Sequence, residues 1–202
     1  MTTRRRLLLA LGSWVAGFAA QAQTTPKPID LPEFTRQRMQ HQRIIGLTLG
    51  GYALANIAAS GIAASRTTGE TRYFHRMGVY WNLVNLGIAG FGLLGARKQA
   101  GQESLAEAVK EHENMKQVLL LNAGLDVAYL MGGTYLIERA NRPTEISRRD
   151  QLRGFGKAVI VQGGFLLAFD VVNYLIFKNR DKQQQQLIQA TEHGVGVVLP
   201  IR

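Results

Sequence analysis

The feature that most constrains the fold of this chain is a set of four long runs with few or no charged side chains. The first, Ile44 to Ser65, holds 22 residues without a charge. About 20 residues rise roughly 30 Å as an α-helix, which matches the hydrocarbon core of a bilayer. Lipid offers backbone groups no hydrogen-bond partners, so such runs predict helices. We therefore predict an all-α integral membrane bundle of four transmembrane helices, at about 44–65, 78–96, 117–137 and 155–177.

The first 22 residues have the features of a secretory signal. Three arginines, Arg4 to Arg6, precede an apolar stretch from Leu7 to Ala20, which ends in the small-x-small sequence Ala20-Gln21-Ala22. This order predicts a signal peptide at 1–22 that is cleaved after Ala22. The alternative is an uncleaved anchor helix, because the apolar stretch is only slightly shorter than a span.

Polar segments divide the rest of the chain. Residues 23–43 form a polar N-terminal segment with an extended, proline-containing first part and a helical second part, and 44–177 form the transmembrane domain. Residues 178–202 form a polar tail that ends in VGVVLPIR, a segment whose role the sequence does not indicate. Short loops are expected at 66–77 and 138–156.

One helix is expected to project well beyond its span. Ser104 and Glu107 have the spacing of a capping box, which starts a helix by pairing side chains with free backbone N–H groups. The charged sequence that follows could run without a break into the third span. We therefore predict a charged helical extension before residue 117.

The net charge of +10 would suggest nucleic-acid binding in a soluble protein. Here, however, the basic residues lie near the N-terminus and beside the apolar runs, where they anchor helices and set topology. We therefore expect the lipid bilayer as a partner and no nucleic acid. The absence of cysteine excludes disulfides, cysteine-ligated zinc and thiol nucleophiles.

Two carboxylates interrupt the apolar runs. Asp126 lies near the centre of the third run and Asp170 lies within the fourth. A charged Asp at the bilayer centre costs about 3 kcal/mol, so both must face the bundle interior. The nearest Lys or Arg is Lys157, 13 residues before Asp170 and about 20 Å away along a helix, so it cannot neutralise them. We therefore expect Asp126 to be protonated or bonded to Asn and Tyr side chains.

Other polar residues share the faces of these two. We predict an intramembrane polar layer made of Asn56, Asn82, Asn85, Asn122, Asp126, Gln162, Asp170 and Asn173. This layer has two interpretations. Its members hold the helices together by interhelical hydrogen bonds, or its carboxylates relay protons or ions.

Small residues recur every four positions in the same runs, a spacing that allows helices to approach closely. On the third run this ridge lies nearly opposite the polar stripe. The predicted packing residues are Gly46, Gly50, Gly92, Gly124, Ala128, Gly132, Gly164 and Ala168.

Two features resemble functional motifs but lack the required context. The sequence GFGLLG, Gly90 to Gly95, matches a nucleotide-binding pattern, yet it lies inside an apolar run with no preceding strand. The four histidines are dispersed, and none pairs at a spacing of three or four residues. We therefore predict no cofactor and no metal site.

The stretches YFHRMGVYWNLVNLGIAGFGLL, LLLNAGLDVAYLMGGTYLIERA and LRGFGKAVIVQGGFLLAFDVVNYLI suggest a family. Over roughly Gln40 to Phe177, the chain resembles a family of small multi-pass bacterial membrane proteins classed as a domain of unknown function. The resemblance implies a helical membrane domain and no assigned activity. The expected location is the bacterial inner (plasma) membrane.

The orientation follows from the signal peptide, which would leave the mature N-terminus outside. The loops at 66–77 and 138–156 then lie inside, and they carry a higher density of Lys and Arg than the outer segments. Both mature termini are expected outside.

Three hypotheses for function follow. The first is a structural or interaction bundle held by buried Asn and Asp hydrogen bonds, either as a homo-oligomer or with an unknown membrane partner. The second is a proton- or ion-coupled carrier or channel that uses Asp126 and Asp170. The third, a membrane-embedded enzyme, is disfavoured because no nucleophile, metal cluster or cofactor motif accompanies the carboxylates.

Overall fold

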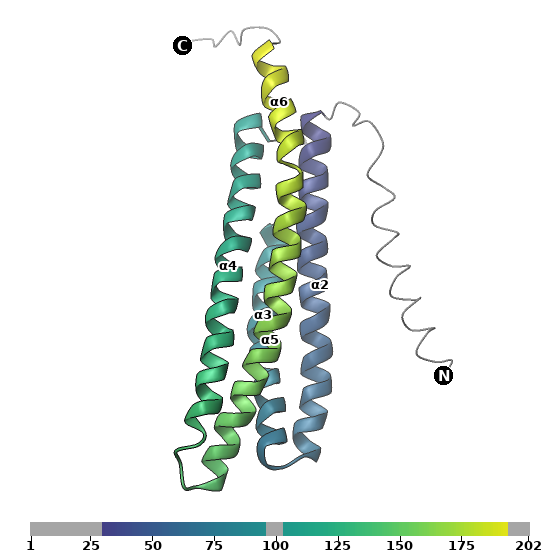
Figure 1. Cartoon of the computed structure of the whole chain (residues 1–202). Coiled ribbons are helices and arrows are strands. Elements are labelled where there is room, and N and C mark those ends of the chain that lie inside the picture. Colours follow the sequence, from purple (N-terminus) through teal and green to yellow (C-terminus); the bar gives the residue numbers. More distant parts are fainter. Residues whose placement is uncertain (1–29, 96–102, 194–202) are drawn as a thin grey trace, which may run out of the picture.

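The computed structural model describes residues 30–95 and 103–193, and over this part the chain is all-α (Figure 1). The predicted signal peptide at 1–22 and the VGVVLPIR segment lie outside the described residues. The helices are α2 (Leu31–Arg66), α3 (Gly69–Gly95), α4 (Leu105–Arg139), α5 (Ile146–Asn179) and α6 (Asp181–His193). In the described part of the chain, helices α2 to α5 are each long and apolar enough to cross a membrane, which confirms the prediction of four long apolar helices.

The four long helices run up and down, so the bundle has two distinct ends (Figure 1). Helices α2 and α4 begin at one end, where α5 is followed by α6. We call this the terminal end. The α2–α3 and α4–α5 connections both lie at the opposite end, which we call the loop end. The start of α2 and the end of α5 therefore lie at the same end of the bundle.

Local capping explains where two of the helices begin. Asp30 accepts a hydrogen bond from the backbone N–H of Glu33 at 2.9 Å and starts α2 thirteen residues before the predicted span. Ser104 and Glu107 form the predicted capping box, with both reciprocal bonds present. This confirms that α4 extends beyond its apolar run as a charged helix.

The loop predicted at 66–77 is largely helical, and this prediction was wrong. Only residues 67 and 68 separate α2 from α3, and Gly69 then begins α3 with φ of 57°. That angle lies in the left-handed region, which glycine adopts at low cost. The polar residues that suggested a loop instead extend α3 beyond its apolar run. The other connection shortens similarly, to residues 140–145.

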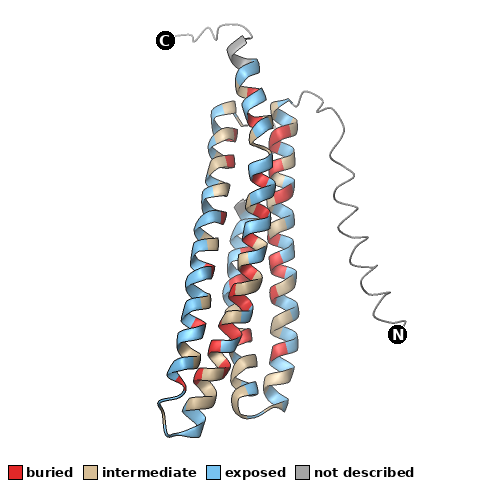
Figure 2. Cartoon of the chain, viewed as in Figure 1, coloured by how far each residue is buried: buried red, intermediate tan, exposed pale blue. Residues whose placement is uncertain are grey.

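Helix α5 occupies the centre of the packing. It packs along both α4 and α3, whereas α2 pairs with α3 and makes few contacts with α4. Buried positions are frequent along α5, while α4 is exposed over most of its length (Figure 2). Helix α4 is therefore held to the bundle chiefly through α5.

Glycines bring the helices closest together in the loop-end half. A Cβ atom placed on Gly133 of α4 would lie 2.7 Å from the carbonyl oxygen of Gly156 of α5, too close for any side chain. A Cβ on Gly154 would lie 2.7 Å from the backbone nitrogen of Phe74. These glycines therefore permit backbone-to-backbone contact between α4, α5 and α3.

The predicted ridge of small residues is not the packing face of α4. Gly124, Ala128 and Gly132 are exposed, and a Cβ on either glycine would meet no atom within 4 Å. The reason is that α5 packs on the opposite, polar stripe of α4, where Gly133 makes the close contact. The prediction for α4 is corrected accordingly.

The other predicted small residues divide in the same way. Gly46 and Gly50 face α3, where Cβ atoms would lie 2.9 Å from Leu93 and 3.5 Å from Ala89 respectively. The remaining three positions have open surroundings or an exposed side chain, namely Gly92, Gly164 and Ala168. Close helix packing in α5 instead uses Gly154, Gly156 and Gly163.

Candidate functional site

The two intramembrane carboxylates come together between α4 and α5. Asp126 is 2% exposed and Asp170 is 7% exposed, and their side chains lie close enough for the two carboxyl groups to share a hydrogen bond. Two carboxyl groups can share a hydrogen bond only if one of them carries a proton, because a carboxylate has no donor. One oxygen of the pair, Asp126 Oδ2, is buried without a partner among the described residues.

The pair borders a cavity rather than a fully packed interface. This cavity, which we call the carboxylate cavity, has a volume of about 320 Å³. Its polar lining consists of Asn85, Asn122, Asp126, Tyr129 and Asp170. Its apolar lining consists of Leu49, Trp81, Val84, Ile88, Leu125, Leu166 and Phe169.

A second cavity of about 510 Å³ adjoins the first on the side of the terminal end. We call it the entrance cavity. The two share Leu49, Ile88, Asn122, Phe169 and Asp170 in their linings. The entrance cavity lies where α2 and α4 make few contacts. A continuous hollow therefore leads from the terminal end of the bundle to the carboxylate pair.

Aromatic side chains close the carboxylate cavity toward the loop end. The rings of Trp81 in α3 and Tyr129 in α4 meet edge to face, with centroids 4.7 Å apart. Tyr129 follows Asp126 by three residues, or about 4.5 Å of helix, in the direction of the loop end. At the same level Gly163 lets α5 approach α4 closely, because a Cβ placed on this glycine would lie 3.3 Å from Tyr129 Cβ.

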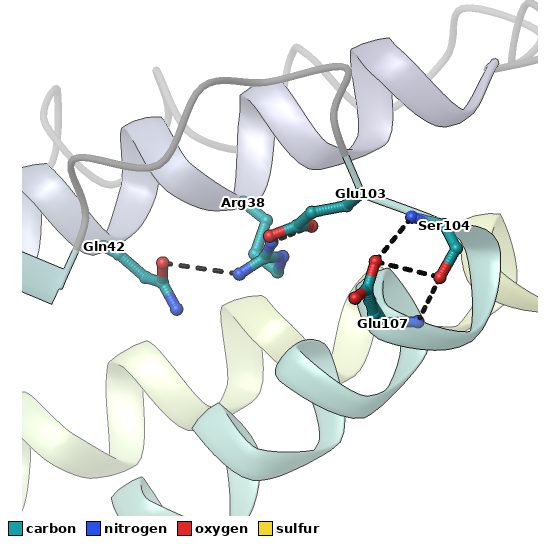
Figure 3. Close-up of polar contacts among 5 residues, drawn as sticks. All are labelled: Arg38, Gln42, Glu103, Ser104 and Glu107. Carbon is teal, nitrogen blue, oxygen red and sulfur yellow. Dashed lines mark hydrogen bonds and ion pairs between the residues drawn. The ribbon is translucent and has the colours of Figure 1, made fainter.

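An ion pair lies at the start of the entrance cavity (Figure 3). Arg38 of α2 and Glu103, just before α4, are 2.5 Å apart, and their side chains are only 3% and 9% exposed. Arg38 also reaches Gln42 at 3.5 Å. The pair is one of the few contacts between α2 and the start of α4.

The charge of the two cavities is opposite to that of the whole chain. The chain carries a formal charge of +10. In contrast, among the described residues Arg38 is the one Lys or Arg that lines either cavity, and it is paired with Glu103. The carboxyl groups in the linings are those of Glu103, Glu111, Asp126 and Asp170. The hollow is therefore acidic.

The predicted polar residues on α5 lie at three levels rather than in one layer. Gln162 accepts a hydrogen bond from the Tyr52 hydroxyl at 2.9 Å, and Asn173 bonds the His41 ring at 2.9 Å. Asp170 lies between these two levels. Eleven residues separate Gln162 from Asn173, so the levels span about 17 Å along the helix. The polar residues of α5 are therefore spread along the helix and do not form the single layer that was predicted.

The four predicted asparagines of the other helices have different environments. Asn82 and Asn56 donate to backbone carbonyl groups one turn earlier in their own helices, at 2.8 and 2.9 Å. Asn82 is fully buried, whereas Asn56 is half-buried. Asn85 and Asn122 instead line the carboxylate cavity, and the buried Asn85 Nδ2 has no partner in the described part of the chain.

Two polar clusters were missed by sequence reasoning because their members lie far apart in the chain. One is the Arg38–Glu103 pair. The other joins α4 to α6 at the terminal end, where the His112 ring nitrogen lies 2.9 Å from Asp181 and Lys116 Nζ lies 2.7 Å from the same carboxylate. Nothing in the sequence around Glu103 or Asp181 indicates which distant residue each one contacts.

The second cluster brings together potential metal ligands that the sequence keeps apart. Ligand atoms of His112, Glu113 and Asp181 lie within 4.8 Å of one another. However, the Lys116 ammonium lies 2.9 Å from Glu113 and 2.7 Å from Asp181. A lysine that bonds both carboxylates occupies the position of a bound cation, so the cluster is satisfied by the chain itself.

Comparison with known proteins gives a family and no function. A family model described as "Family of unknown function (DUF6992)" matches residues 48–171, which is most of the helical bundle, and the chain belongs to this family. No curated protein matches the chain. No solved structure matches it either.

Proposed function

We propose that this member of DUF6992 is a multi-pass membrane protein that exchanges a proton or a cation at the Asp126–Asp170 pair, as a proton- or ion-coupled carrier. The observation that carries the proposal is that the two carboxyl groups meet at the wall of an acidic hollow. A pair that only joined helices would have no need of the adjoining space. Intramembrane carboxylates that face a cavity are typical of proton and ion pathways.

The surface of the bundle supports membrane insertion. Large apolar side chains point outward along all four long helices, including Leu54, Phe91, Leu121, Met131 and Val172, each more than half exposed. An apolar surface of this extent is stable when it faces lipid. We propose the bacterial inner membrane as the location, with a cleaved signal peptide and both mature termini outside.

The arrangement of helices suggests how exchange would proceed. The hollow leads to the pair from the terminal end, and the Trp81–Tyr129 contact closes the opposite side. A proton held between the carboxyl groups occupies the place of a cation, and loss of the proton leaves two negative charges that attract one. Access from the loop end would then require α4 to move relative to α3, separating Trp81 from Tyr129.

A structural bundle remains the second candidate, and a specific observation favours it. The Tyr52–Gln162 and His41–Asn173 hydrogen bonds join α2 to α5 across the bundle. We call such an interhelical hydrogen bond, which stabilises the contact between two helices, a staple. In this view Asp126 and Asp170 are a third staple. Catalysis is not proposed, because no Ser, Thr or His side chain lines either described cavity.

A carbodiimide experiment distinguishes the two candidates. Hydrophobic carbodiimides modify protonated carboxyl groups that are accessible from lipid, and mass spectrometry of the purified protein locates the adduct. We expect modification at Asp126 or Asp170 that decreases as the pH is raised, together with proton flux into proteoliposomes that the adduct blocks. Asp126→Asn and Asp170→Asn should each abolish the flux.

Glu138→Gln is the matched control, since Glu138 is an exposed carboxylate on α4 at the loop end. It should leave the flux unchanged. If neither Asp is modified and the Asn variants conduct protons as the unaltered chain does, the pair is a staple and the carrier proposal is wrong.

A further inference from the structure

We propose that the ligand of the carboxylate cavity is a lipophilic organic cation, which displaces the proton from the Asp126–Asp170 pair. The inference rests on the proposed function, because it names the class of cation exchanged at the same site. Six features of the hollow support it: its charge, the composition of its wall, its size, its aromatic rings, its unpartnered polar groups and the route into it.

The charge selects a cation. Of the residues that the structure describes, four with carboxyl groups and one arginine line the two cavities, and the arginine is already paired with Glu103. An anion would therefore meet uncompensated carboxylates in a site of low dielectric constant, where like charges repel strongly. A cation instead replaces the positive charge that the pair loses when its proton leaves.

The composition of the wall selects an organic cation over a metal ion. Ca²⁺ takes six to eight oxygen ligands, and Mg²⁺ about six. The carboxylate cavity supplies side-chain oxygens from two carboxyl groups, two amides and one phenol, spread over a lining that is otherwise apolar. A dehydrated metal ion would lose more hydration than this wall returns. A cation that carries its own apolar groups avoids that cost.

The size of the hollow fits such a molecule. The carboxylate and entrance cavities measure about 320 and 510 Å³ and adjoin each other. Cavities that hold small organic ligands measure about 300–1,000 Å³, and their walls are mostly apolar with a few polar groups. Both descriptions apply here.

Aromatic rings line the same cavity as the carboxyl pair. Trp81, Tyr129 and Phe169 all line the carboxylate cavity, and Phe169 also lines the entrance. The faces of aromatic rings attract cations by about 0.5–2 kcal/mol each, and quaternary ammonium groups are bound in this way. Aromatic rings beside a carboxylate therefore recognise a cation with little surface hydration.

The unpartnered groups identify where the ligand makes polar contact. Asp126 Oδ2 and Asn85 Nδ2 are both buried and lack partners in the described residues, and both residues line the cavity. A buried polar atom without a partner costs about 1–3 kcal/mol. A bound cation would place its positive charge against Asp126 Oδ2, and a ligand acceptor would satisfy Asn85.

The route into the cavity fits a ligand that dissolves in lipid. The entrance cavity lies beside the sparse contact between α2 and α4, and the outer surfaces of these helices are apolar. A lipophilic cation concentrates at the membrane interface and can enter between the helices from there. Glu111, which lines the entrance, supplies a first attractive charge on this path.

The exchange conserves charge. In the resting state the carboxyl pair holds one proton in its shared hydrogen bond. The arriving cation takes that position, the proton leaves to water, and the charge of the site is unchanged. One cation bound should therefore release one proton, and lowering the pH should weaken binding.

The test uses tetraphenylphosphonium as the probe and tetraphenylborate as its matched control, since the two ions share a shape and differ in the sign of their charge. For this test, Trp14 of the full-length chain is replaced by Phe, so that Trp81 is the single tryptophan. Quenching of Trp81 fluorescence in detergent then reports entry into the carboxylate cavity. We expect saturable quenching by the cation, weaker as the pH falls, and none by the anion.

Two variant pairs, measured by calorimetry, locate the binding determinants. Asp126→Asn should weaken binding about tenfold, as loss of about 1.4 kcal/mol would, whereas Glu138→Gln should not. Trp81→Leu should weaken it about fivefold, the equivalent of one cation–π contact of about 1 kcal/mol. The adjacent Tyr80→Leu is its control, because Tyr80 points outward and is 52% exposed.

The outcomes separate this inference from the proposed function. Equal quenching by both ions, or quenching independent of pH, would mean simple hydrophobic partition and would overturn the inference. If the carbodiimide modifies Asp126 or Asp170 and flux depends on them, but the cation neither quenches Trp81 nor protects the carboxyl groups from modification, the carrier proposal stands and the ligand class is wrong. Protection by the cation together with proton release supports both.

Discussion

The two halves of the bundle are stabilised in different ways. In the loop-end half, Gly133, Gly154 and Gly156 bring α4, α5 and α3 into backbone contact. In the half nearer the terminal end, α2 and α4 make few contacts, and two adjoining cavities separate them. Polar pairs such as Arg38–Glu103 join the helices there, together with a small apolar cluster in which Phe34 of α2, Ala108 of α4 and Leu187 of α6 pack on one another.

Helix α4 is therefore held at both ends, by backbone contact with α5 in the loop-end half and by the packing of Ala108 and the His112–Asp181 contact at the terminal end. Between these two contacts it borders the cavities. The carboxyl pair lies near the boundary between the two halves, just beyond the Trp81–Tyr129 contact. A small rotation of α4 would therefore change the access of solvent to the pair.

The largest expected effect concerns the ion pair at the terminal end. Removing one partner of a buried pair leaves an uncompensated charge, so Glu103→Gln should lower the free energy of unfolding by about 3–5 kcal/mol. Thermal unfolding in mild detergent, followed by circular dichroism, measures the change. The double variant Arg38→Met, Glu103→Leu should unfold at a higher temperature than Glu103→Gln alone.

An exposed pair provides the control for this substitution. Glu33 and Arg36 lie on the surface of α2, where ion pairs contribute about 0–1 kcal/mol. Glu33→Gln should therefore have a small effect. If Glu103→Gln proves equally mild, polar pairing does not stabilise the terminal half and the contrast between the halves is wrong.

The next effect concerns close packing in the loop-end half. In Gly133→Ala, the new methyl group would meet the Gly156 carbonyl oxygen and Ile160, and overpacking of this kind costs about 1–3 kcal/mol. The neighbouring Gly132→Ala adds the same methyl group where no atom lies within 4 Å. It should be neutral or slightly stabilising, because alanine favours helix by about 1 kcal/mol relative to glycine.

The unfolding temperatures of the two alanine variants test whether Gly133 is tightly packed and Gly132 is not. The oligomeric state of each variant tests whether the exposed ridge contacts another molecule. A Gly132→Ala variant that is destabilised as much as Gly133→Ala would show that the exposed ridge contacts another molecule. Light scattering in detergent would then reveal whether a homo-oligomer dissociates. We expect Gly132→Ala to leave the light-scattering profile unchanged.

The smallest effect concerns the staple between α2 and α5. Tyr52→Phe removes the hydrogen bond to Gln162 while keeping the ring stacked on Phe165, with centroids 3.7 Å apart. The loss should be about 0.5–1.5 kcal/mol, the net contribution of one hydrogen bond. Tyr80→Phe, on the exposed side of α3, should leave the unfolding temperature unchanged. A loss above about 3 kcal/mol would instead show that the Tyr52 hydroxyl supports a wider network.

Much of the fold was predictable because helices of this kind are specified locally. Apolar length located α2 to α5, and the spacing of Ser104 and Glu107 located the start of α4. The α2–α3 connection was mispredicted because polarity was taken to mean a loop. A helix that has left the apolar layer can carry polar side chains without ending.

The faces of the helices were only partly predictable. Helical periodicity placed Asn122, Asp126 and Gly133 on one side of α4 and the small ridge on the other. It could not say which side meets α5, since both small residues and polar residues promote helix packing. The structure gives that role to the polar side, where Gly133 supplies the close approach.

The sequence by itself determined that this chain forms long apolar helices with buried polar groups, because length, hydropathy and capping act within a few turns. Tertiary structure alone decided that Asp126 meets Asp170, that Arg38 meets Glu103 and that the carboxyl pair borders a hollow. The members of each pair lie far apart in the chain. Their distances depend on how four helices pack around one another, which no local pattern encodes.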